Sequence, residues 1–193
     1  MFVSDLRHFL NLPDDAPGPA RKLAEQLGDV VRAATAAEAG TGWVSALPCR
    51  RRPGRRPCPG RIIIFRPDLP ARIEWRCTCC GDEGVISGWE GTYCDLRAST
   101  HRRSTGTVAD IVVPDEVATA LRDLQLLDAD CERLVYQARA TDDGVVLSAD
   151  DDELDDLLGF VAAEANHEPN RRRQQRLDRA FAVLSDALQA MGT

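Results

Sequence analysis

The chain has 193 residues, 44% of them hydrophobic and 28% charged, which is the composition of globular domains and allows one large domain or two small ones. The N-terminal residues lack the cationic start and continuous apolar run of a signal peptide, and no stretch approaches the roughly 20 apolar residues of a membrane span. We therefore expect a cytoplasmic protein without a membrane partner, whose seven cysteines favour a metal site over disulfides.

The net charge of −7 is unevenly distributed along the chain. Residues 1–48 carry a net charge of −2, residues 49–104 carry +6 and residues 105–193 carry −11. A basic centre beside an acidic C-terminal half indicates two modules. Lys22 is the only lysine, and a GC-rich genome produces the same arginine bias through codon usage, so arginine content alone is weak evidence for nucleic-acid binding.

The N-terminal part predicts one long helix. Residues 1–12 fit a helical face about as well as a strand. The Asp-Asp-Ala-Pro sequence at 14–17 is a helix start signal. Apolar residues then recur at helical spacing from Ala20 to Ala34, which predicts an amphipathic helix of about five turns that ends at Gly40.

The central part is rich in Gly, Pro, Arg, Cys and Trp, with short β-prone runs. Residues 61–65 form a strand candidate between Pro-Gly and Pro. Residues 72–76 alternate apolar and polar side chains as they approach a cysteine cluster, and residues 84–89 follow that cluster. This order predicts a strand, a tight cysteine turn and a second strand.

The C-terminal part predicts two short strands and a pair of helices. Residues 108–113 and 145–147 are the strand candidates, whereas residues 128–140 fit a helix or a strand. Ser148 with Asp151 resembles a capping box. Apolar stripes at 154–165 and 177–191, separated by a break at Asn166 to Asn170, predict an αα-hairpin.

These patterns predict an α+β fold with two domains. Residues 1–96 are expected to form an N-terminal helix with a small β-rich module around the cysteines, and residues 97–106 a linker. Residues 107–193 are expected to form an acidic, mainly helical domain that ends in the αα-hairpin.

Four cysteines predict one structural Zn²⁺ ion, the expected cofactor. Cys77 and Cys80 have two residues between them and Gly81 after them, a turn that directs two thiolates at one ion. Cys49 and Cys58 have eight residues between them, but Pro53-Gly54 can reverse the chain and return both to the same ion. Cys79, Cys94 and His101 remain alternative ligands.

These cysteines, Gly81 and the strands around them make the central segment similar to the zinc-ribbon superfamily. The resemblance covers about a quarter of the chain, and the long first loop departs from the family, which makes Cys49 the weakest ligand. The whole chain also resembles bacterial proteins with an arginine-rich cysteine loop, a W-x-C-x-x-C-G-D-x-G turn (here 75–84) and an E-A-N-H segment (164–167). That second resemblance implies no function.

The clearest surface for an anionic partner is the cysteine loop. It carries five guanidinium groups that can contact phosphates: Arg50, Arg51, Arg52, Arg55 and Arg56. An equally good interpretation is a solvated loop that offsets the charge of the metal thiolates. Trp75 and Trp89 can stack on a base, although burial in the ribbon core is the favoured interpretation.

No phosphate loop, nucleophile elbow or metalloprotease helix is present in the sequence, so we expect a protein that is not an enzyme. The first hypothesis is a rigid zinc platform for nucleic acid or a nucleic-acid-associated complex. The second is a protein–protein adaptor or regulator that acts through the acidic C-terminal helices. A thiol-based redox or zinc sensor is the third.

Overall fold

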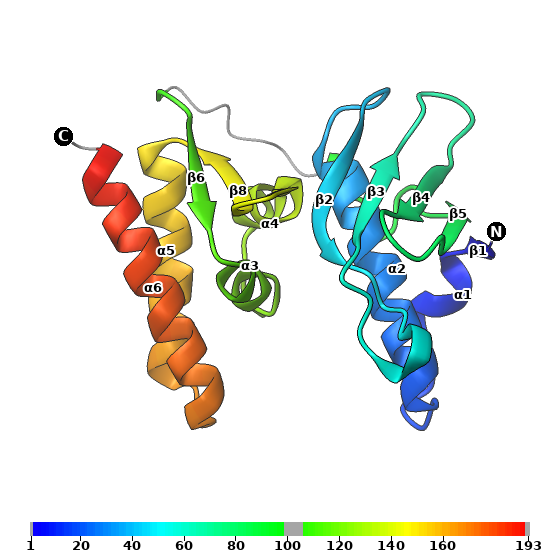
Figure 1. Cartoon of the computed structure of the whole chain (residues 1–193), viewed down its shortest axis with the longest axis horizontal. Helices are drawn as coiled ribbons and strands as arrows, with labels where there is room; N and C mark the ends of the chain where they lie inside the picture. Colours follow the sequence, from blue (N-terminus) through cyan, green and yellow to red (C-terminus); the bar gives the residue numbers. More distant parts are fainter. Residues whose placement is uncertain (1, 99–105, 192–193) are drawn as a thin grey trace. The chain divides into compact units, whose positions relative to one another are not determined.

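The computed structural model describes residues 2–98 and 106–191, and its elements are shown in Figure 1. The chain divides into two units, Met1–Ala98 and Ser99–Thr193. Most of the expected linker, residues 99–105, lies outside the described residues, as does the candidate ligand His101.

The first unit contains a mixed sheet with the strand order β1-β5-β4-β3-β2, in which β1 is parallel to β5 and the other pairs are antiparallel. The strands are β1 (Phe2–Asp5), β2 (Gly42–Pro48), β3 (Arg61–Phe65), β4 (Ile73–Cys77) and β5 (Glu83–Ser87). Two α-helices, α1 (Arg7–Leu10) and α2 (Gly18–Ala36), and two short 3₁₀ turns, η1 (Pro53–Arg55) and η2 (Leu96–Ala98), complete the unit. The ambiguous N-terminal segment is thus a strand followed by one helical turn.

One face of this sheet packs against α2. Side chains of a strand alternate between its two faces, so Ile62 and Ile64 of β3 are buried while Ile63 and Phe65 are half-buried. The apolar stripe of α2, which includes Val30 and Val31, is likewise buried. The core of the unit therefore lies between α2 and one face of the sheet.

A buried arginine joins the end of β3 to the end of α2. The Arg66 Nε and Nη2 atoms donate to the carbonyl oxygens of Ala34 and Ala37 at 2.8 and 2.9 Å. The last carbonyls of a helix have no partner within the helix, so this guanidinium group satisfies two of them. The contact fixes where the helix lies on the sheet.

In the second unit, residues 106–191 form a three-stranded antiparallel sheet, in the order β7-β8-β6, and four helices. Its strands are β6 (Ala109–Val113), β7 (Arg139–Thr141) and β8 (Gly144–Ala149). Its helices are α3 (Asp115–Arg122), α4 (Ala129–Gln137), α5 (Asp151–His167) and α6 (Arg171–Met191). The ambiguous residues 128–140 are therefore α4 followed by β7.

The two C-terminal helices form the expected αα-hairpin, with α5 and α6 side by side (Figure 1). Buried apolar residues from both helices, such as Leu157 and Leu177, make the interface. Arg173 of α6 adds ion pairs to Glu164 and Glu168 and donates to the carbonyl oxygen of Asp123. These helices and the two sheets confirm the α+β fold class.

The capping box of α5 lies two residues beyond the expected position, so the Ser148–Asp151 prediction was wrong. The Asp150 carboxylate accepts from the Glu153 amide at 2.8 Å, and the Glu153 carboxylate accepts from the Asp150 amide at 3.0 Å. Ser148 instead belongs to β8 and donates to Asp110 of β6 at 2.6 Å. The strand continues through Ala149, which moves the cap to the next residue.

Replacing Asp150 with alanine should therefore destabilise the second unit by about 1–2 kcal/mol, because the cap of α5 is lost. Asp151→Ala removes only a carboxylate near the positive end of the helix dipole and should cost about 0.3–0.5 kcal/mol. Urea unfolding followed by far-ultraviolet circular dichroism measures both changes. Equal losses in the two variants would contradict the assignment of Asp150 as the cap.

Candidate metal centre

The ends of two hairpins meet at one end of the first sheet, and the four predicted cysteine ligands lie there. Cys49 directly follows β2, and Cys58 precedes β3 by three positions. Cys77 is the last residue of β4, and Cys80 lies in the turn to β5. The β3–β4 pairing places Ile62 opposite Cys77, and this register brings the two turns together.

The four sulfur atoms all lie within 4.8 Å of one another. The Cys49 and Cys80 sulfurs are 3.6 Å apart, and those of Cys58 and Cys77 are 3.7 Å apart. A tetrahedral zinc ion with Zn–S bonds of about 2.3 Å would hold its sulfurs about 3.8 Å apart, whereas a disulfide would need about 2.05 Å. The arrangement therefore suits a metal ion and does not suit a disulfide.

Backbone amides point at the sulfur atoms. The amides of Arg51 and Gly60 lie 3.4 Å from the Cys49 and Cys58 sulfurs, and that of Cys79 lies 3.3 Å from the Cys77 sulfur. Burial raises the pKa of Cys77, but amide and thiol hydrogen bonds outweigh it and bring this pKa down to about 7. Burial is the main cause of the raised pKa of Cys49.

Gly60 is a requirement of the site that the sequence analysis did not identify. A Cβ atom at this position would overlap the Cys77 sulfur and lie 2.8 Å from the Cys79 Cβ. The two cysteine turns can approach each other only because residue 60 has no side chain. The signal in the sequence was the Cys-Pro-Gly order at 58–60, which places a glycine two residues after a ligand.

The eight residues between Cys49 and Cys58 form an ordered extension of the β2–β3 hairpin. The Cys58 amide donates to the Arg51 carbonyl at 2.9 Å, and the Cys49 amide donates to the Gly60 carbonyl at the same distance. Positive φ angles at Gly54 (60°) and Arg55 (66°) reverse the chain at the tip. Cys49, expected to be the weakest ligand, is therefore as well placed as the other three.

The alternative ligands Cys79 and Cys94 lie outside the sulfur cluster. Cys79 follows Cys77 by two residues but is exposed, and Cys94 is buried close to Gly28 of α2. Cys131 is buried in α4 of the second unit. Among the described residues, the cluster consists of the four predicted cysteines.

The two tryptophans do not offer an open face for stacking. Trp75 is 5% exposed and Trp89 is 1% exposed, which agrees with the core role that the sequence favoured. The Arg97 guanidinium group also covers the Trp89 ring, 4.3 Å from its centroid. Neither side chain can stack on a nucleic-acid base in this conformation.

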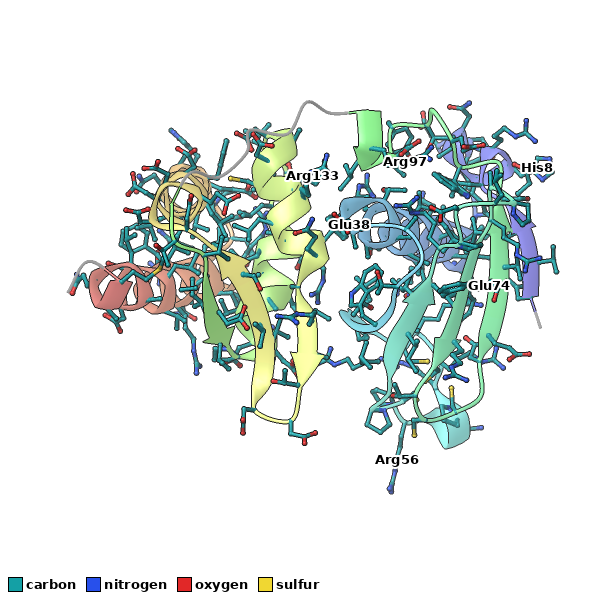
Figure 2. The ribbon with its side chains drawn as sticks, turned by 90° about the horizontal axis from the view of Figure 1, so that it is seen from above. His8, Glu38, Arg56, Glu74, Arg97 and Arg133 are labelled. Atoms are coloured by element: carbon teal, nitrogen blue, oxygen red, sulfur yellow. The ribbon has the colours of Figure 1, made fainter. Side chains whose placement is uncertain are left out.

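The loop of residues 50–56 (the arginine loop) presents guanidinium groups beside the sulfur cluster. Arg50 and Arg51 lie 3.9 and 3.7 Å from the Asp82 carboxylate. Arg52, Arg55 and Arg56 are exposed and form no ion pair with any described residue. Figure 2 shows Arg56 extending away from the loop.

No family model, curated protein or solved structure shows significant similarity to the chain. The zinc-ribbon resemblance therefore rests on the cysteine motifs and on the sulfur geometry. None of the described helices is long and apolar enough to cross a membrane.

Replacing Gly60 with alanine should reduce the bound metal well below one ion per chain, because the added methyl group separates the two cysteine turns. Gly18→Ala is the matched control, since its Cβ would meet nothing within 4 Å. Metal analysis of both purified variants tests the prediction. Full metal content in Gly60→Ala protein would contradict it.

Metal affinity should fall as the pH falls, because the ion must displace protons from the thiols. Cys77, with a pKa of about 7, is largely a thiolate at pH 8 and largely protonated at pH 6. The number of protons released on binding should therefore rise by about one between pH 8 and pH 6. Competition with a chromogenic chelator across this range measures the metal affinity, and its slope against pH gives the number of protons released. An affinity independent of pH would contradict cysteine ligation.

Proposed function

We propose that the chain is a non-enzymatic nucleic-acid-binding protein in which Cys49, Cys58, Cys77 and Cys80 hold one structural Zn²⁺ ion. One observation carries the proposal: the arginine loop begins at one ligand and ends at another. The sulfur cluster and the backbone hydrogen bonds of Cys49 and Cys58 close this loop at its base, so a bound ion would fix the segment that carries the five arginines.

The choice of zinc follows from the donor set. Four thiolates in a tetrahedron are typical of structural zinc sites, which leave no position open for a substrate. The four thiolates and Zn²⁺ carry a net charge of about −2. Arg50 and Arg51, near the Cys80 turn and Asp82, offset this charge.

The choice of a phosphate partner follows from the other three arginines. Arg52, Arg55 and Arg56 have no acidic partner among the described residues, so their guanidinium groups are available to an external anion. A hollow of about 430 Å³ lies between Arg50, Arg51, Arg52, Pro53 and Cys80. Phosphate oxygens match the planar fork of a guanidinium group.

The charge of the rest of the chain favours a local contact with the nucleic acid. Residues 105–193 carry a net charge of −11, which repels a polyanion. We therefore expect a moderate affinity for nucleic acid that depends strongly on salt and on the arginine loop. We do not expect non-specific electrostatic binding over the whole protein surface.

Replacing Arg55 and Arg56 together with glutamine should weaken the binding of an oligonucleotide at least tenfold. It should also reduce the slope of log affinity against log salt by about two, because two phosphate contacts are lost. Arg171→Gln with Arg172→Gln is the matched control, since these are also adjacent, exposed and without an ion pair among the described residues. Fluorescence anisotropy at several salt concentrations measures both quantities.

Removing the metal ion tests the same proposal in a second way. Chelation should weaken binding as the Arg55/Arg56 variant does, because the base of the loop opens. The proposal fails if wild-type protein binds no oligonucleotide at low salt, or if the control variant loses as much affinity as the loop variant.

The adaptor hypothesis has one observation in its favour. Four carboxylates at the start of α5 are exposed: Asp151, Asp152, Asp155 and Asp156. They form an acidic surface suited to a basic protein partner, although the helix dipole alone explains an acidic first turn. Loss of a protein partner on replacing these four residues with asparagine, with oligonucleotide binding unaffected, would support this second function.

A further inference from the structure

The face of the first sheet opposite α2 keeps apolar side chains partly exposed. Ile63, Phe65 and Val85 on this face are half-buried, and Val3 of the edge strand is 66% exposed. The register aligns them across the strands, with Val85 opposite both Val3 and Glu74, and Glu74 opposite Phe65. Glu74 and Arg76 of β4 therefore lie between two apolar parts of this face, with Ile63 and the Phe65 ring on one side and Val85 and Val3 on the other.

Three neighbouring hollows lie between this face and the arginine loop, and together they are called the groove. A hollow of about 710 Å³ lies over the sheet face, with Phe65, Arg76 and Glu83 in its lining. A second hollow of about 360 Å³ shares Glu83 with the first and contains Phe2, Arg50 and Arg51. The 430 Å³ hollow of the arginine loop also contains Arg50 and Arg51, so each hollow shares lining residues with the next.

We propose that this groove binds single-stranded nucleic acid, with bases on the sheet face around Phe65 and phosphates on Arg76 and the arginine loop. The inference rests on the proposed function, because it uses the same loop. It adds a strand preference and two contact residues, Phe65 and Arg76, which lie outside the loop.

The charges along the groove favour a backbone path on the arginine side. The Arg76 side chain is exposed and forms no ion pair with a described residue. Arg72 lies 2.7 Å from Glu74, and Asp82 is paired with Arg50 and Arg51, so two of the acidic groups near the groove are already neutralised. Among the described residues, Arg76 at the sheet and Arg52, Arg55 and Arg56 in the loop have no carboxylate in an ion pair with them.

The apolar surface favours single strands over duplexes. Base faces are stacked inside a duplex and cannot reach a protein ring, whereas an unpaired base can lie against Phe65 and the aliphatic residues beside it. The phosphates of a duplex would still reach the arginine loop. The sheet face therefore adds affinity that only a single strand can use.

The test measures binding of the full metal-loaded chain to labelled oligonucleotides of about 12 nucleotides, within the range of single-strand site sizes. Three probes have the same sequence: single-stranded DNA, single-stranded RNA and duplex DNA. We expect at least one of the single strands to bind about tenfold more tightly than the duplex. The tighter of the two single strands identifies the natural class.

Two variants test the assigned residues. Phe65→Leu keeps an apolar side chain but removes the ring, and should weaken single-strand binding at least fivefold with little effect on the duplex. Arg76→Gln should weaken it about threefold to tenfold and reduce the salt slope by about one. Phe181→Leu, a replacement of a partly exposed phenylalanine in α6, and Arg171→Gln are the controls. Circular dichroism and metal content confirm that each variant is folded.

Two results would overturn the inference while leaving the proposed function intact. One is a wild-type protein that binds duplex as tightly as single strands and loses both through Arg55 and Arg56. The other is wild-type affinity in Phe65→Leu and Arg76→Gln. A wild-type protein that binds no oligonucleotide, including one whose sheet face instead captures a polypeptide, would overturn both.

Discussion

The register between β3 and β4 is the constraint on which the metal centre depends. Because Ile62 lies opposite Cys77, the turn after β4 meets the connection before β3, and four sulfur atoms gather at one end of the sheet. A shift of one residue would turn every side chain of a strand to the other face, which would move Cys77 away from Cys58 and expose Ile62 and Ile64. The buried isoleucines that pack on α2 therefore also set the position of the thiols.

Different interactions stabilise the ends of the helices and strands in the two units. The second unit has a mainly apolar core between its helices and sheet, and the Asp150–Glu153 capping box and the ion pairs of Arg173 hold the ends of α5 and α6. The first unit has a smaller helical cover and two irregular cysteine turns, whose backbone is held by amide–sulfur contacts and by the Arg61–Thr78 hydrogen bonds. A bound metal ion would replace, in those turns, the stabilisation that packing supplies elsewhere.

Patterns that depend on near neighbours could be read from the sequence. The periodic stripes of α2, α5 and α6, the short β-prone run of β3, the alternation in β4 and the Cys77–Cys80 turn all belong to this class. Strand β2 could not be predicted, because Trp43-Val44-Ser45-Ala46 follows a Gly-rich turn and gains its strand character from pairing with β3. The meeting of Cys49 with Cys80, and the empty space that Gly60 must leave, depend on residues far apart in the chain.

The hairpin extension between Cys49 and Cys58 has a consequence for how the protein can vary. Both ends of this segment are fixed by backbone hydrogen bonds to Arg51 and Gly60, and the residues of its tip are exposed. Lengthening such a closed loop costs little conformational entropy. A change in its length or charge should therefore leave the sulfur cluster and the sheet beneath it unchanged.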